Sequence, residues 1–254
     1  MRGNETGGVV AAFFDLDGTL IPGPSLERRF FADLRYRRTI PIGNYFLWLA
    51  KAVRLAPRGI QTMRHANKMY LRSVRRDGSE FSDTERINRA VPRFFPAAID
   101  HVTWHAKQGH GIVLVSGTLA PLADEMALAL VVRLAVRGIE ASVGVCATRL
   151  EENEGRWTGR ILGDAMFGEA KARAVRRIAA EGGFDLSQCY AYGNCANDRW
   201  MLEAVGRPTA VNPSRGMERL ARRRGWSVLL WAEKSTLTQT VQKRHRRDQA
   251  KKVA

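Results

Sequence analysis

Hydrophobic runs and helix-type repeats alternate along most of this chain. Apolar runs of strand length are expected at 9–14, 111–116, 142–147, 188–193, 208–211 and 226–231. Helical periodicity is expected at 119–136, 168–182, 196–205 and 214–224. Because strands that alternate with helices are typical of parallel sheets covered on both faces, the pattern predicts an α/β fold with a doubly wound, mostly parallel sheet.

Residues 24–100 interrupt this alternation with helical periodicity and almost no strand pattern. The expected helices span 25–37, 44–55, 59–75 and 82–105, with boundaries or kinks at Pro41, Pro57, Pro92 and Pro96. We therefore expect a Rossmann-like core from 1–23 and 101–242, a helical domain from 24–100 and a basic tail from 243–254. Residues 156–161 are expected to form an exposed extended piece between 147 and 165.

The composition narrows the class of protein. The chain has 254 residues and is 45% hydrophobic, which is sufficient for a buried core. It has no apolar run of about 18 residues, and residues 1–8 lack the apolar centre of a secretion signal. Cys146, Cys189 and Cys195 form no closely spaced pair, which argues against a disulfide framework or a zinc site. We expect a cytoplasmic protein, with peripheral attachment at the inner face of the membrane left open.

The net charge of +16 is unevenly distributed. Residues 24–100 carry +9 of it and residues 243–254 carry +5. A basic surface attracts phosphate groups of any kind, so phosphorylated substrates, anionic lipids and nucleic acids are all candidate partners. The alternative is a cationic surface that serves only solubility. No zinc-finger or RNA-recognition signature accompanies the basic clusters, which disfavours nucleic acid as the main partner. The oligomeric state stays open.

The segment Asn44–Leu55 is aromatic, apolar and edged with cations, yet too short to span a bilayer. It is either an internal helix or one that lies at a membrane interface. We favour the internal alternative because surface helices normally bury such a stripe, whereas an interfacial helix would need the stripe to stay exposed.

Polar side chains gather where the expected strands end. Asp15 and Asp17 follow the first strand, and ligands of open α/β sheets bind beyond the carboxyl ends of strands. The same residues would also suit a plain turn. Ser116-Gly117-Thr118 follows the second strand and is expected to open a helix, where hydroxyls and backbone N–H groups hold phosphate oxygens or simply cap the helix.

Two further features follow in order. Lys171 lies early in a basic helix, where an ammonium group offsets charge on a transferring phosphoryl group or is merely solvated. Asn194 and Asp198 follow a strand and suit a hard cation, or form an ordinary strand-to-helix turn. The three histidines at 101, 105 and 110 are interpreted as core or surface residues rather than metal ligands.

Together these segments, over residues 9–231, resemble the four motifs of the haloacid dehalogenase (HAD) superfamily of phosphohydrolases. The helical insert between the first and second motifs resembles the C1 cap type, and the whole resembles subfamily IB, the branch that includes phosphoserine phosphatase. The resemblance implies a HAD-type Rossmannoid core with an inserted α-helical C1 cap domain.

The resemblance also implies a Mg²⁺-dependent phosphatase that acts through an aspartyl-phosphate on a small phosphorylated metabolite or a lipid phosphate head group. Asp15 would be the nucleophile and Asp17 the acid and base. Phosphate would be bound by Ser116, Gly117, Thr118 and Lys171, and the metal by Asp15, Asp17, Asn194 and Asp198. An arginine-rich cap would supply substrate contacts, because arginine binds phosphate and carboxylate bidentately.

Two positions depart from the family pattern. Asn194 stands where an aspartate usually binds Mg²⁺, which should weaken the cation site, and a catalytically impaired homologue that only binds phosphoryl ligands is the alternative. Phosphoserine phosphatases carry a glutamate nine residues after the nucleophile, where this chain has Pro24. Glu27, three residues later, is the nearest substitute, so phosphoserine is disfavoured as the substrate.

Overall fold

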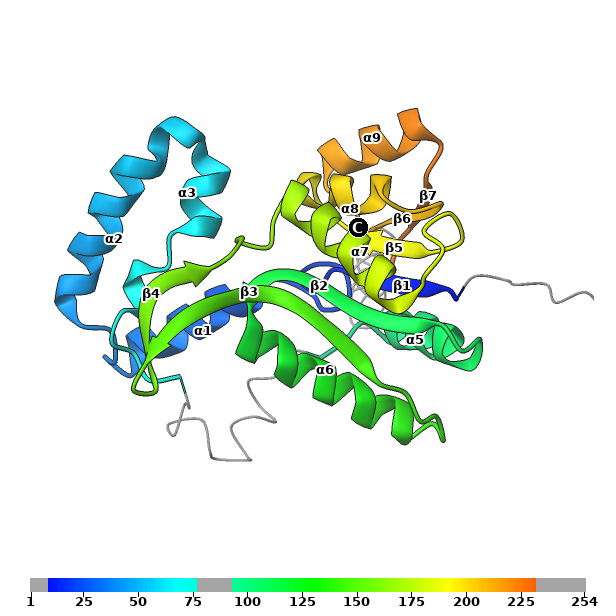
Figure 1. The fold of residues 1–254 in the computed structure, drawn as a ribbon, viewed down its shortest axis with the longest axis horizontal. Coiled ribbons are helices and arrows are strands. Elements are labelled where there is room, and N and C mark those ends of the chain that lie inside the picture. Colours follow the sequence, from blue (N-terminus) through cyan, green and yellow to red (C-terminus); the bar gives the residue numbers. More distant parts are fainter. Residues whose placement is uncertain (1–8, 77–92, 232–254) are drawn as a thin grey trace, which may run out of the picture.

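The computed structural model describes residues 9–76 and 93–231 (Figure 1). Seven strands form one sheet in the order β4-β3-β2-β1-β5-β6-β7, and every neighbouring pair is parallel except β3 and β4. The strands are β1 (Ala11–Phe14), β2 (Gly111–Leu119), β3 (Val143–Asn153), β4 (Arg156–Leu162), β5 (Tyr190–Gly193), β6 (Arg207–Val211) and β7 (Ser227–Leu229). The expected mostly parallel α/β sheet is confirmed.

Helices cover both faces of this sheet. One face carries α5 (Pro96–Lys107) and α6 (Ala120–Ala135), and the other carries α7 (Glu169–Gly182), α8 (Arg199–Glu203) and α9 (Arg215–Arg224). Successive side chains of β1 alternate between the two cores, with Phe14 on the α5 and α6 side and Phe13 on the other. Burial on both faces explains why β1 reads as a continuous apolar run.

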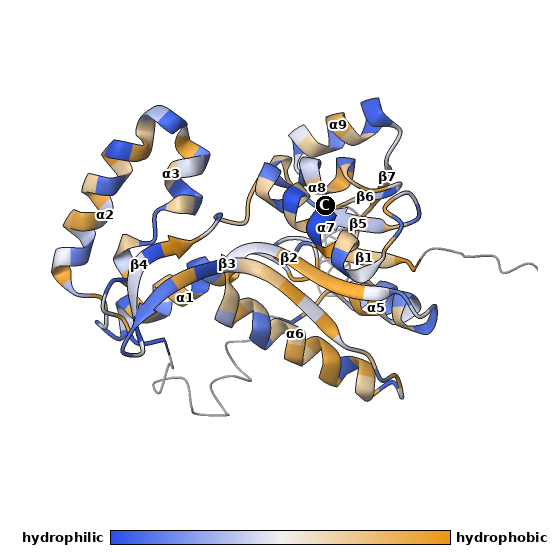
Figure 2. Cartoon of the chain, viewed as in Figure 1, coloured by the Kyte–Doolittle hydropathy of each residue, from blue (hydrophilic) through white to orange (hydrophobic). Residues whose placement is uncertain are grey.

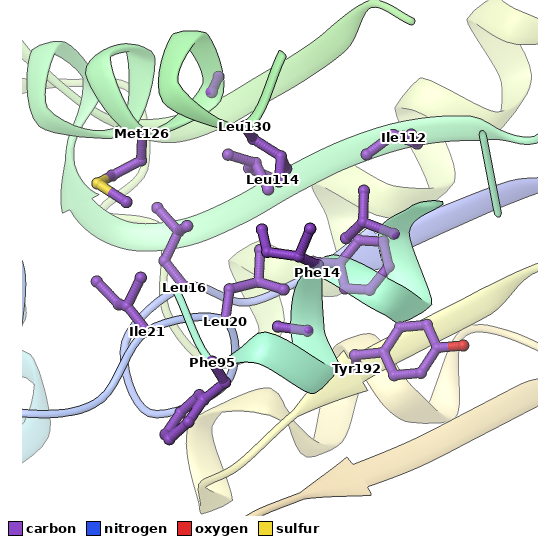
Figure 3. Close-up of a cluster of buried hydrophobic side chains, with 14 of the residues drawn as sticks. Phe14, Leu16, Leu20, Ile21, Phe95, Ile112, Leu114, Met126, Leu130 and Tyr192 are labelled. Carbon is purple, nitrogen blue, oxygen red and sulfur yellow. The ribbon is translucent and has the colours of Figure 1, made fainter. Parts of the chain in front are cut away.

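The loop after β1 is anchored in one of these cores. Leu16, Leu20 and Ile21 are fully buried among side chains of α5, α6 and β2 (Figure 3). Leu16 stands between Asp15 and Asp17, so its burial fixes the backbone that carries both carboxylates. The apolar loop residues therefore hold the polar ones in place.

The insert after this loop contains α1 (Leu26–Tyr36), α2 (Ile42–Leu55) and α3 (Ile60–Ala66). The expectation of one helix over 59–75 is wrong, because α3 ends at Ala66 and a short 3₁₀ turn follows at Met69–Leu71. The extended backbone at Asn67 ends the helix, and its side chain donates to the carbonyl of Trp48 at 2.8 Å. Its Oδ1 also accepts from the N–H of Met69 at 3.4 Å, a local bond of the kind by which asparagine competes with helix hydrogen bonding.

The helix expected over 82–105 also needs correction. Residues 82–92 lie outside the described residues, and 93–95 are not helical, because α5 begins at Pro96. Proline suits the first helical turn, where its missing N–H has no partner to lose.

Residues 156–161 are extended, as expected, but they are not all exposed. They form β4, which pairs with the outer part of β3, and Trp157 is buried against Phe30 of α1 with an edge-to-face ring contact of 6.0 Å. A third core joins α1 and residues 70–74 of the insert to Leu119, Leu150 and Trp157. The β3–β4 hairpin is thus the surface on which the insert packs.

The expectation that α2 packs internally is met on one side of the helix only. Asn44, Ala52 and Leu55 are buried, whereas the opposite side is exposed to solvent. Within the part of the chain that the structure describes, every helix is too short or too polar to cross a bilayer.

His105 is a fully buried core histidine, as expected from the sequence. Its Nε2 lies 2.8 Å from the Tyr192 hydroxyl and its Nδ1 lies 2.8 Å from Nδ1 of His110. Burial, with the neighbouring His110 and His101, lowers the pKa of His105 to about 3. The ring is therefore neutral at pH 7.

We expect the free energy of unfolding to fall as the pH drops from about 6.5 towards 3. The unfolded chain protonates His105 near pH 6.5, while the folded chain does so only near pH 3, so acid favours the unfolded state. Urea denaturation at several pH values measures the slope, to which one such group contributes at most about 1.4 kcal/mol per pH unit. His105→Gln should make it shallower; equal slopes in the two proteins would contradict this account.

Candidate active site

Lys171 bridges two buried carboxylates at the carboxyl ends of the central strands. Its Nζ donates to Oδ1 of Asp15 and to Oδ1 of Asp198, each at 2.6 Å. Asp15 directly follows β1, Asp198 ends a 3₁₀ turn after β5, and Lys171 lies in the first turn of α7. Three of the residues expected at the site are thus in direct contact, although Lys171 is 156 positions from Asp15 and 27 positions from Asp198 in the sequence.

The electrostatics of this group follow from burial and from the balance of charges. Burial and the neighbouring Asp198 raise the pKa of Asp15 to about 7, against the lowering effect of Lys171. Burial alone would lower the pKa of Lys171, but the two carboxylates raise it, so the group stays an ammonium. Burial opposes ionisation of Asp198, yet Lys171 and the N–H of Cys195 hold its pKa below the ordinary value.

Asp17 lies on the same loop but has a different partner. Its Oδ1 accepts a hydrogen bond from the backbone N–H of Leu26, the first residue of α1, at 2.8 Å. Burial raises the pKa of Asp17, against the lowering effects of the Leu26 N–H and of Lys171. A carboxyl group that retains its proton more readily suits a general acid.

Asn194 lies between the two acidic segments. Its backbone N–H donates to Oδ2 of Asp198 at 3.0 Å. Its side chain packs against Gly18, where a Cβ atom would come within 2.0 Å of Nδ2 and where φ is +84°. Only glycine satisfies both the backbone conformation and this close approach.

The expectation that Ser116, Gly117 and Thr118 open a helix is wrong. They lie inside β2, at a register shift against β3, and α6 begins only at Ala120. Oγ of Ser116 accepts from the N–H of Thr118 at 3.3 Å. Oγ1 of Thr118 is buried without a partner among the described residues, which leaves it free to bind a ligand oxygen.

His65 also reaches this site, and sequence reasoning missed it. It projects from α3, its Nε2 lies 3.4 Å from Nδ2 of Asn197, and its ring stacks on Phe167 at 4.9 Å. A Cβ atom at Gly117 would lie 3.6 Å from its Nδ1. Burial, with nearby Lys68, lowers its pKa to about 4, so the ring is neutral at pH 7.

Thr19 was missed as well. Its Oγ1 donates to Oδ2 of Asp15 at 3.2 Å, so both oxygens of that carboxylate have partners. This contact could have been expected from position, because Thr19 belongs to the same loop motif. His65 could not be predicted in this way, because a single histidine in a helical insert belongs to no motif whose spacing indicates an active-site residue.

A buried charged group lies on the insert side. Lys68, fully buried, donates to both carboxylate oxygens of Glu27, and the Tyr70 hydroxyl donates to Oε1 of Glu27 at 2.7 Å. The negative charge of Glu27 is therefore already compensated within the protein.

The donor set suits a hard cation such as Mg²⁺. Lys171 pairs with the carboxylates of Asp15 and Asp198, and Asp17 lies close enough to feel its charge, so carboxyl groups outnumber the ammonium group at this buried place. Among the described residues no three His, Cys, Asp or Glu side chains form a ready metal cage. Mg²⁺ commonly binds through one or two carboxylates plus water and substrate phosphate, so these residues fit it.

Comparisons with known proteins agree with this geometry. Residues 12–203 match the family model of the haloacid dehalogenase-like hydrolases. The chain is 32% identical to a probable phosphatase of Mycobacterium tuberculosis, over 91% of this chain and 78% of the relative. It is 29% identical to phosphoserine phosphatase SerB1 of the same species, over 86% and 70%. A Bordetella pertussis structure of unknown function superposes with a TM-score of 0.67 at 29% identity, over 87% and 98%.

We expect Lys171→Met to be strongly destabilised, by about 3–5 kcal/mol, because it leaves two buried carboxylates without a cation. The loss should be larger at pH 8 than at pH 5. In the variant the carboxyl groups bind protons more tightly when folded than when unfolded, so acid restores part of the stability. Denaturant melts of both proteins without added metal measure this, with the exposed Lys107→Met as control. A loss independent of pH would contradict the assignment.

Proposed function

Because this chain belongs to the haloacid dehalogenase-like hydrolase family and is a phosphatase of that family, we propose that it hydrolyses phosphomonoesters through an aspartyl-phosphate at Asp15, with Mg²⁺ as cofactor. The observation that carries the proposal is the contact of Lys171 with both Asp15 and Asp198. That contact places a permanent cation beside the carboxylate that would attack phosphorus.

The chemistry divides between two carboxyl groups. An oxygen of Asp15 attacks phosphorus while the bond to the ester oxygen breaks, and Asp17 gives its proton to the departing alcohol. Asp17, now ionised, takes a proton from the water that attacks the phosphoenzyme, which frees phosphate and restores Asp15. Lys171 and the Thr118 hydroxyl, which has no partner among the described residues, stabilise the charge on the phosphoryl oxygens. Bound Mg²⁺ would neutralise part of the charge on nucleophile and phosphate.

The substrate class follows from the insert side of the site. We propose a small phosphorylated metabolite or a lipid phosphate head group without a free ammonium group. Glu27, the acid that could bind an amine, is already paired with Lys68 and Tyr70. An incoming ammonium would have to displace a fully buried cation. Phosphoserine therefore stays disfavoured, although one relative is named for it.

We expect Asp15→Asn to lower the turnover of 4-nitrophenyl phosphate by at least about a thousandfold, because an amide oxygen is a poor nucleophile. Phosphate release with and without Mg²⁺, together with a panel of phosphorylated metabolites, measures this. Mg²⁺-dependent turnover that persists in the variant would overturn the role of Asp15. Inactivity of the wild type at high Mg²⁺ towards every substrate would favour an impaired homologue that only binds phosphoryl ligands.

We expect Asn194→Asp to lower the Mg²⁺ concentration needed for half-maximal turnover by about tenfold, because a carboxylate binds a hard cation more tightly than an amide does. Mg²⁺ titration of turnover in both proteins is the measurement. The exposed Asn153→Asp adds the same charge far from the site and should leave the requirement unchanged. Equal Mg²⁺ requirements in wild type and Asn194→Asp would show that residue 194 does not contact the metal.

A further inference from the structure

The outer face of α2 is apolar and exposed. Ile42, Phe46, Leu49 and Val53 have exposed fractions of 77%, 70%, 57% and 68%. At 3.6 residues per turn these four positions fall within a sector of about 60°, so they form one stripe along the helix. Figures 1 and 2 show α2 at one edge of the molecule, beyond β4, with hydrophobic residues along its length.

The stripe lies opposite the side of α2 that packs on the insert. The inner side carries the buried residues Asn44, Ala52 and Leu55. The Asn44 amide donates to the carbonyls of Tyr70 and Arg72. The orientation of α2 is thus fixed by polar and apolar contacts on its inner side. Contiguous apolar surface of this kind commonly marks an interaction site.

The charged residues on α2, on α3 and on the segment that joins them all have one sign. Residues 34–76 contain eleven lysines and arginines and no aspartate or glutamate. Arg54, Arg58 and Arg64, on α2, on the following turn and on α3, are exposed. An apolar stripe on a helix edged only by cations is the pattern of helices that lie in the interface of an anionic bilayer.

We propose that the outer face of α2 docks on the surface of an anionic lipid bilayer, with the stripe in the interfacial layer and the cations on lipid phosphates. The proposal deepens, and rests on, the proposed phosphatase function, because it brings the insert next to lipid head groups. On this proposal, the active site meets phosphorylated head groups while the protein is bound to the bilayer surface.

Two other occupants fit the charges less well. A second copy of the chain would place two acid-free, cationic surfaces against each other, which like charges oppose. A nucleic acid would engage the arginines but would leave the apolar stripe in the middle of the contact without a partner. A bilayer satisfies the cations and the stripe together.

The test is sedimentation of the full chain with vesicles. Phosphatidylglycerol-containing vesicles should bind the protein and pure phosphatidylcholine vesicles should bind it at least about tenfold less, with binding that weakens as salt rises. The triple variant F46S/L49S/V53S should bind anionic vesicles about tenfold or more weakly, because it removes apolar surface that enters the interface. Its turnover of 4-nitrophenyl phosphate should equal that of the wild type.

The chain offers a matched control on α6. Leu128, Val132 and Val136 form a second exposed apolar stripe, with exposed fractions of 66%, 53% and 82%, but Asp124 and Glu125 lie on the same helix. L128S/V132S/V136S should therefore leave vesicle binding unchanged. Thermal melts of both triple variants check that each is folded.

Several outcomes would overturn the proposal. Vesicle binding that survives F46S/L49S/V53S would assign the attachment to cations elsewhere, the basic tail included. Binding lost equally in the α6 variant would show that the attachment is not specific to α2. If the wild type self-associates in sedimentation velocity and F46S/L49S/V53S does not, the outer face of α2 is a contact between copies of the chain instead. Because binding is read without turnover, an inactive protein that binds vesicles would refute the proposed reaction and leave the docking intact.

Discussion

The site depends on one ammonium group held between two buried carboxylates. Without Lys171, the buried carboxylates of Asp15 and Asp198 would have no cation between them, and burial would drive at least one of them to bind a proton. With it, the segments after β1 and β5 and the start of α7 are drawn to one point. The same contact that makes the site reactive therefore also joins three segments that are distant in sequence.

Much of this could be predicted from the sequence, because parallel strands bring their carboxyl ends to one edge. Asp15, Ser116 and Asn194 each follow an apolar run, and the structure places all three at that edge. The local geometry was harder to predict. Ser116 to Thr118 stay in the strand because β2 continues through a register shift, which no residue pattern announces.

The insert was predicted least well, for a physical reason. Helical periodicity shows that a face is apolar but does not show what covers it. Trp157 was expected to be exposed and is buried by α1, whereas the stripe on α2 was expected to be buried and is exposed. Likewise Lys68 contacts Glu27, and His65 contacts Asn197, through the packing of segments distant in sequence, so their proximity has no signature in spacing. Long-range packing decided each of these cases.

The β3–β4 hairpin makes the folding of the insert depend on a later part of the chain. Phe30 and Leu71 complete their core only with Leu150 and Trp157, which leave the ribosome about 80 to 130 residues later. The insert is continuous in sequence, yet during synthesis its apolar side chains cannot be fully buried until the β3–β4 hairpin has been made. Such contacts of high sequence separation form slowly, because the long loop between them must first close. The insert therefore ends its folding together with the sheet, and a fragment cut at its sequence boundaries would lack part of its own interior.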